Sequence, residues 1–114
     1  MTAPRIAMPN RVCPECGAGF VAHHGRQRFC QSAHQTAFHG RNKQRGQVLL
    51  PLAQVFRMGK RGKTVDRAFA FGEMCRLLDM WNAEDKDSGR RPELVVTVKR
   101  RKGWTAADMS TWRG

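Results

Sequence analysis

The sequence predicts a small α+β protein, in which an N-terminal module of one hairpin and one helix precedes a mainly helical C-terminal half with one short strand. Three observations support this fold class. The chain has 114 residues, enough for one small domain or two very small modules. Three of the four cysteines and all four histidines lie between residues 11 and 46. After residue 46, apolar residues recur mainly at helical spacing.

The composition indicates that the hydrophobic core alone is too small to stabilise the fold, so that a stabilising element outside the core is expected. Leu, Ile, Val and Phe together number 21, and the formal net charge is +12, so the compact state has few large apolar side chains and repels itself. We expect a flexible tail over residues 1–10, a ligand-rich module over residues 11–46, and a helical region with basic segments over residues 47–114.

The ligand-rich module contains the string CPECGAGFVAHHGRQRFCQSAH. Cys13 and Cys16 are two residues apart, and Cys30 and His34 three residues apart, which is ligand spacing for structural zinc. Residues at i and i+4 share one face of a helix, and Gly17 permits a left-handed backbone after the first pair. The sequence therefore predicts one structural zinc ion, with His39 as the reserve for the fourth ligand.

These residues resemble the treble-clef zinc fingers of small bacterial and phage proteins, which carry CPxCG, a hairpin, and then RFCS with a further ligand three residues on. The resemblance covers about residues 11–46. It implies a knuckle formed by Cys13 and Cys16 and helix-borne ligands at Cys30 and His34, where the usual fourth ligand is cysteine. Such fingers bind DNA, RNA or other proteins.

Within the module, the length of the segment Phe20 to Phe29 and its central Gly25 predict a hairpin between the two ligand pairs. We expect five apolar side chains to form the small core: Val12, Phe20, Phe29, Ala37 and Phe38.

In the C-terminal half, residues 48–58 predict a short helix, with Pro51 near its first turn. A longer helix is expected from Thr64 to near Ala83. Its predicted buried face, in which Cys75 packs as a core residue, consists of Val65, Ala68, Phe69, Gly72, Cys75, Leu78 and Trp81.

The last third of the chain predicts a loop over residues 83–93 and a short strand over residues 94–98 (LVVTV). A final helical turn is expected at residues 105–112, where Thr105 and Asp108 have the spacing of a capping box.

The charge predicts a polyanionic partner, DNA or RNA, since the sequence pI is about 11.1. We expect no membrane association, because no segment is apolar enough to span a bilayer and no amphipathic helix opposes cations to large apolar residues. We expect a cytoplasmic protein with reduced cysteines, because residues 1–10 lack the apolar region of a secretory signal. We expect no catalysis and no small-molecule substrate.

The candidate phosphate contacts lie in two clusters, at residues 26–28 and 41–45, and in two later basic runs, at residues 60–63 and 100–101. The expected nucleic-acid-binding residues are Arg26, Arg28, Arg41, Lys43, Arg45, Lys60, Arg61, Lys63, Arg100 and Arg101. The alternative is that these cations offset helix dipoles and solvate the surface. Gln31 and Gln35 are either base-reading residues or ordinary solvated glutamines.

Three other interpretations remain open. Residues 48–98 can be arranged as a helix-turn-helix with a wing. A protein-docking adaptor would expose apolar surface around Trp81, Trp104 and Trp112. A nuclease of the ββα-metal type would use His23 and His24, but no carboxylate lies near them in the sequence to share a catalytic magnesium.

Overall fold

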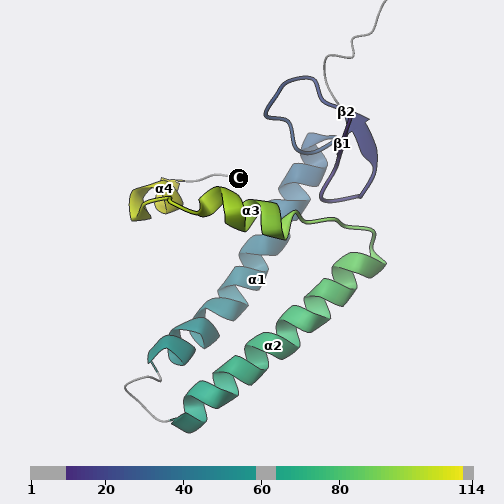
Figure 1. Ribbon diagram of the computed structural model, residues 1–114. Helices are drawn as coiled ribbons and strands as arrows, with labels where there is room; N and C mark the ends of the chain where they lie inside the picture. The colour runs from purple at the N-terminus through teal and green to yellow at the C-terminus, as the bar shows by residue number, and fades with distance from the viewer. Residues whose placement is uncertain (1–9, 59–63, 112–114) are drawn as a thin grey trace, which may run out of the picture.

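The computed structural model describes residues 10–58 and 64–111 and confirms a small α+β protein that is mostly helical. In chain order, its elements are β1 (Asn10–Val12), β2 (Gly19–Val21), α1 (Ser32–Met58), α2 (Thr64–Asp87), α3 (Leu94–Arg101) and α4 (Ala106–Thr111). Helices α1 and α2 form a long antiparallel pair, and the two-stranded sheet lies at the N-terminal end of α1 (Figure 1). None of the helices in these two ranges is long and apolar enough to cross a membrane.

The β-hairpin closes around the first ligand pair. Its antiparallel register aligns Asn10 with Val21 and Val12 with Gly19, so residues 13–18 form the turn. The prediction of a hairpin over Phe20 to Phe29 is therefore wrong, because residues 22–31 form a loop without strand pairing. The backbone already reverses at the knuckle, which leaves the later segment to lead from the sheet to α1.

Helix α1 is continuous over 27 residues, so the expected separate helix at residues 48–58 is wrong. Pro51 lies inside α1, seven residues before its last residue, rather than near a first turn. A proline inside a helix removes one backbone hydrogen bond. Pro51 is exposed, and contacts with α2 hold the helix on both sides of it, through Arg45 towards the N-terminus and Phe56 towards the C-terminus.

One stripe of each long helix faces the other. The least exposed positions recur every three or four residues, as in an antiparallel coiled coil. Ala70, on this stripe of α2, is 1% exposed. The rings of Phe56 and Phe71 lie 5.3 Å apart near the α1–α2 turn. At the other end, the guanidinium of Arg45 lies 5.3 Å from the ring of Trp81.

The buried face predicted for α2 is wrong, because most of it points to solvent. Phe69 is 66% exposed and Cys75 is also exposed, so Cys75 is not a core residue. The helix carries two apolar stripes, and the stripe with the small side chain of Ala70 faces α1. A small residue lets two helices approach, and the pairing of Asp85 with Arg45 fixes the same rotation.

Helix α2 ends four residues later than expected, in a Schellman motif. Gly89 has a φ of +75°, its N–H donates to the Lys86 carbonyl over 3.1 Å, and the Arg90 N–H donates to the Asp85 carbonyl over 2.8 Å. Glycine adopts this left-handed conformation without steric cost. The loop expected from residue 83 therefore begins only after Asp87.

The strand expected at residues 94–98 is wrong, because Leu94–Arg101 forms α3. A lone strand has no hydrogen-bond partner, whereas a helix satisfies its own backbone, and the three cations in the last turn of α3 favour its C-terminus. With α1 and α2 side by side and no strand after α2 among the described residues, the helix-turn-helix with a wing is not formed (Figure 1). The capping box is confirmed: the Asp108 N–H donates to Thr105 Oγ1, and the Thr105 N–H donates to Asp108 Oδ2.

The main buried cluster lies beside the knuckle. It contains Cys13, Phe29 and Phe38, with Phe20 partly buried against it. The rings of Phe29 and Phe38 lie 5.2 Å apart. Two of the five expected core residues are wrong, because Val12 is 40% exposed and Ala37 is exposed on the outer side of α1.

Candidate metal centre and basic surface

The fold brings Cys13, Cys16, Cys30 and His34 together in a cluster close enough to bind one metal ion, consistent with a zinc finger. One ligand atom from each residue lies within 4.8 Å of all the others. Cys16 Sγ and Cys30 Sγ are 3.7 Å apart, and Cys13 Sγ and His34 Nδ1 are 3.8 Å apart. A tetrahedral ion with bonds of about 2.3 Å to sulfur requires ligand separations of roughly 3.8 Å. The cluster therefore has the dimensions of a Cys₃His site.

Two short local structures position these ligands. Gly17, with a φ of +74°, turns the knuckle so that its N–H donates to the Cys13 carbonyl over 2.8 Å. Cys30 precedes α1, and His34 lies in its first turn, which puts Cys30 Sγ 3.1 Å from His34 Nδ1. His39 is outside the cluster, because its ring packs edge-on against Phe29.

The thiols of Cys13 and Cys30 have pKa values shifted in opposite directions. Burial raises the pKa of the Cys13 thiol, but hydrogen bonds from the backbone N–H groups of Cys30 and Cys16 outweigh burial and lower it to about 6. Burial, together with the neighbouring sulfurs of Cys16 and Cys13, raises the pKa of Cys30 to about 11. Adjacent thiolates repel one another, so a cation is what allows all three to be ionised together.

An ion pair fastens the knuckle to α1. Arg41 donates through both terminal nitrogens to the two carboxylate oxygens of Glu15, each over 2.7 Å. The Arg41 guanidinium lowers the pKa of the Glu15 carboxyl and is itself held in the charged form. Because Glu15 lies between the first two ligands, this pair fixes the knuckle against the helix that carries His34.

The loop after α2 packs directly on the knuckle, a contact that the sequence analysis did not anticipate. The Arg91 N–H donates to the Pro14 carbonyl over 2.8 Å. A Cβ on Gly17 would overlap the backbone carbonyl of Gly89, so Gly17 is required for this close approach, whereas Gly89 is required for its positive φ. A glycine directly after the end of a helix is the sequence signal for such a turn, but it does not show which surface the turn contacts.

A second ion-pair network joins the C-terminal end of α2 to α1. Arg45 donates to both oxygens of Asp85, over 2.9 and 3.0 Å, and Arg90 donates to Asp85 Oδ1 over 2.8 Å. Burial alone would raise the pKa of Asp85, but the two arginines lower it. The side chains of Arg45, Asp85 and Arg90 are only 11–15% exposed, so these charges are mostly withdrawn from solvent.

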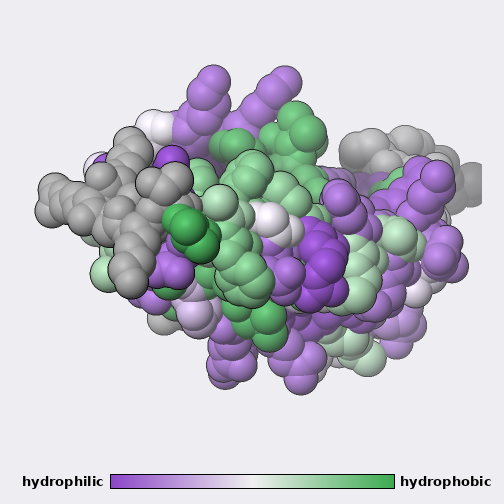
Figure 2. Space-filling view, turned by 90° about the horizontal axis from the view of Figure 1, so that it is seen from below, coloured by the Kyte–Doolittle hydropathy of each residue, from purple (hydrophilic) through white to green (hydrophobic). Residues whose placement is uncertain are grey.

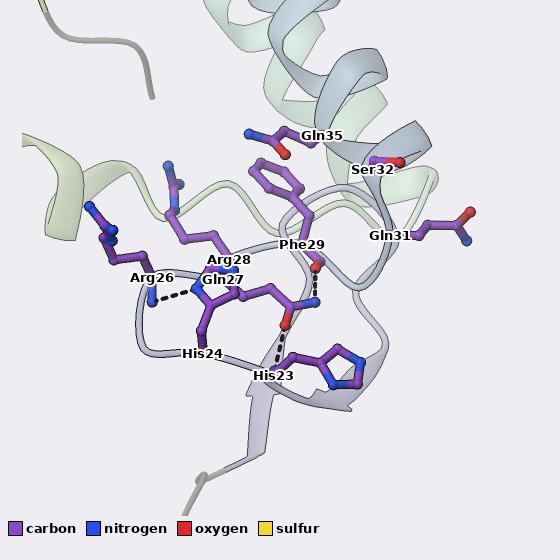
Figure 3. Close-up of a pocket in the computed structure, with 9 residues that line it drawn as sticks. All are labelled: His23, His24, Arg26, Gln27, Arg28, Phe29, Gln31, Ser32 and Gln35. Atoms are coloured by element: carbon purple, nitrogen blue, oxygen red, sulfur yellow. Dashed lines mark hydrogen bonds between the residues drawn. The ribbon is translucent and has the colours of Figure 1, made fainter.

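Arg26 and Arg28 come together with His23 and His24 around a hollow of about 330 Å³ beside the start of α1 (Figure 3). The loop at residues 22–31 contributes most of the lining residues, and Ser32 and Gln35 line the hollow from α1. Among its lining residues there is no carboxylate.

The other expected nucleic-acid contacts are dispersed. Arg41 and Arg45 are engaged by carboxylates, whereas Lys43 lies exposed between them on α1. At the end of α3, Arg100 is exposed and Arg101 is half-buried. Lys60, Arg61 and Lys63 lie outside the described residues.

Charge divides unequally along the chain. Residues 1–63 contain eleven Lys or Arg and the single acid Glu15, whereas residues 64–114 contain ten Lys or Arg and eight acids. Ion pairs from α1 to Asp85 and Glu84 use acids of the second half. The positive excess is therefore concentrated in the part of the chain that contains the metal ligands and α1.

No protein-family model, curated protein or solved structure matches this chain.

Proposed function

We propose that this protein binds nucleic acid through its N-terminal half, that one zinc ion held by Cys13, Cys16, Cys30 and His34 is structural, and that the protein is not an enzyme. Two features support a treble-clef type for this module: its knuckle is the turn of a β-hairpin, and its second ligand pair straddles the start of a helix. Four protein ligands complete a tetrahedron and leave no open position for catalysis.

The observation that carries the binding proposal is the charge distribution. Eleven cations against one acid in residues 1–63 produce a positive field that attracts phosphates before contact. The exposed Lys43 and the arginines around the hollow supply the direct contacts, and α3 adds a further basic run. Contacts to phosphates alone leave the choice between DNA and RNA to the shape of the strand.

Binding to a duplex and to a single strand, each measured at two salt concentrations, tests this proposal. We expect affinity to fall steeply with salt, and Lys43→Ala to reduce the logarithmic slope by about 0.9 on duplex DNA. Arg76→Ala is the matched control, because it removes one charge from an α2 residue that pairs with Glu73. No binding at low salt, or an equal loss in both variants, would contradict the proposal.

A protein-docking adaptor is the second candidate, favoured by exposed apolar side chains on the helical hairpin. Figure 2 shows apolar surface extending across the middle of one face of the molecule. The large apolar side chains exposed on α1 and α2 are Val48, Leu50, Val55, Met58, Val65, Phe69, Phe71, Leu78 and Met80. Of the tryptophans expected in this surface, Trp81 and Trp104 are half-buried and Trp112 lies outside the described residues. Sedimentation over a range of protein concentrations tests whether this surface binds a second copy of the chain. A monomer at every concentration would contradict that form of docking.

The nuclease alternative finds no support in the hollow that contains His23 and His24. Magnesium prefers oxygen ligands, and the residues lining this hollow include no carboxylate. We therefore expect no plasmid cleavage with magnesium or manganese, and cleavage that disappears in His24→Ala would overturn this part of the proposal.

A further inference from the structure

The hollow beside the start of α1 has a defined shape, because hydrogen bonds from the side chains of Gln27 and Arg11 hold its loop. Gln27 Oε1 accepts a hydrogen bond from the His23 N–H over 2.6 Å, and Gln27 Nε2 donates to the Phe29 carbonyl over 2.9 Å (Figure 3). Arg11, on β1, donates to the Gln27 carbonyl over 2.7 Å. The loop that carries the two arginines is thus fastened both to itself and to the sheet.

The arginines are held at fixed places on that loop. The Arg26 N–H donates to His24 Nδ1 over 3.2 Å, and the guanidinium carbon of Arg28 lies 5.5 Å from the centre of the Phe29 ring. Phe29 is itself only 5% exposed, in the cluster next to the metal ligands. Two cations are therefore presented from a backbone that the metal module supports.

The electrostatics of the hollow favour an anion. Its lining carries two guanidinium groups and no carboxylate, and the first turn of α1 contains no acidic residue. A helix N-terminus adds a positive partial charge, and concave walls concentrate the field.

We propose that this hollow is a phosphate-binding site. Arg26 and Arg28 donate to the phosphate oxygens, and the side-chain amide of Gln35 supplies a neutral donor from α1. The volume of about 330 Å³ lies at the lower end of the range for small-ligand pockets and accommodates about one nucleotide unit. The inference rests on the proposed function in one respect: the phosphate is that of a nucleic-acid strand.

Amide NMR spectra of the zinc-loaded full chain, titrated with inorganic phosphate against sodium chloride at equal ionic strength, test the site directly. We expect saturable shifts confined to residues 23–35. Arg26→Ala should weaken phosphate binding about fivefold or more, because one charge-assisted pair is lost. Arg26 is exposed, so its truncation leaves the core intact, and Arg76→Ala is the control that should match the wild type. Shifts that do not saturate, or that chloride reproduces, would overturn the proposal.

Arg28 packs on Phe29, so truncation to alanine would also remove a packing contact. The variant chosen at this position is Arg28→Lys, which keeps the charge but loses the planar, two-donor geometry. We expect Arg28→Lys to weaken phosphate binding while the spectrum of residues 10–22 stays unchanged. Wild-type affinity in both the Arg26→Ala and Arg28→Lys variants would show that phosphate binds elsewhere.

Oligonucleotides with and without a 5′-phosphate distinguish the two sources of the group. A preference for the 5′-phosphorylated strand indicates a terminal phosphate, and equal binding that inorganic phosphate displaces indicates an internal phosphodiester. Salt-dependent binding that neither phosphate nor Arg26→Ala affects would refute the site and leave the proposed function standing. Saturable phosphate shifts without any oligonucleotide binding would keep the site and refute the nucleic-acid role.

Discussion

The two ends of the α1–α2 pair differ in how they are held together. At the metal end, Cys13 is fully buried, Phe29 and Phe38 pack beside it, and mostly buried ion pairs join the helices to each other and to the knuckle. At the turn end, the Phe56–Phe71 ring pair is accompanied by side chains that stay in solvent, among them Phe69 at 66% exposure.

This difference shows how a chain with few large apolar residues obtains a fixed structure. Where ligands, ion pairs and a small core coincide, each orders the others. Where the helices have only each other, one apolar stripe per helix is covered and the rest remains exposed. Stability should therefore be concentrated at the metal end, and the following variants test that distribution.

The largest effect is expected from loss of a metal ligand. Cys30→Ser should abolish stoichiometric zinc binding and remove a binding free energy on the order of 10 kcal/mol, as in zinc-finger peptides. Metal analysis and the amide dispersion of residues 10–45 measure this outcome. Cys75→Ser is the control, since Cys75 is exposed and outside the cluster. A Cys30→Ser protein with one zinc and unchanged dispersion would refute the assigned ligand set.

Next in size is a matched pair of phenylalanine truncations at the two ends. Phe38→Ala at the metal end, where the side chain is 8% exposed, should cost about 3 kcal/mol or more of unfolding free energy. Phe69→Ala at the turn end should change the unfolding free energy by less than about 0.5 kcal/mol. Denaturant unfolding of both variants measures the two losses of unfolding free energy. Equal losses would mean that the two ends are equally well packed.

A smaller loss is expected where the α2 loop meets the knuckle. Gly17→Ala places a Cβ on a backbone with positive φ and against the Gly89 carbonyl, which should destabilise the protein by about 2 kcal/mol. Gly25→Ala is the control, because its Cβ would meet open space. If thermal unfolding shows both variants to be equally stable, the loop does not pack on the knuckle as described.

The smallest effect concerns the Asp85 network. Asp85→Asn should cost about 1–2 kcal/mol at neutral pH, because two mostly buried arginines lose a charged acceptor. Glu73→Gln, in the exposed pair with Arg76, should cost clearly less, because solvent screens that pair. Equal losses in the two variants would contradict a special role for Asp85.

The Asp85 carboxyl also gives this contribution a defined pH dependence. Its pKa is lowered in the folded protein, so the stabilisation is fully present above the ordinary aspartate pKa and is lost as the pH falls through the lower, folded value. The stability difference between the wild type and Asp85→Asn should therefore shrink on acidification. A difference that stays constant with pH would show that the charge of Asp85 contributes nothing.

The ligand cluster could be predicted from the sequence because its determinants are local. Two residues separate Cys13 from Cys16, one helical turn separates Cys30 from His34, and the capping box at Thr105 spans three residues. Such spacings fix geometry without reference to the rest of the chain. Zinc itself, the treble-clef type and the nucleic-acid role remain predictions.

What could not be predicted depends on contacts between distant residues. Helix α2 carries two apolar stripes, and only the pairing of Asp85 with Arg45, 40 residues away, shows which one faces α1. The β-branched run at residues 94–98 favours a strand, but among the described residues it meets no strand to pair with and forms a helix. The partner of Arg41 is likewise 26 residues distant, so this arginine was expected at a phosphate and lies on a carboxylate.

X-ray absorption at the zinc edge of the purified protein tests the central claim most directly, that one metal ion organises the N-terminal module. We predict one zinc per chain, with three sulfur ligands at about 2.3 Å and one nitrogen at about 2.0 to 2.1 Å. A shell of oxygen ligands, or a metal-free protein that still unfolds cooperatively, would contradict it.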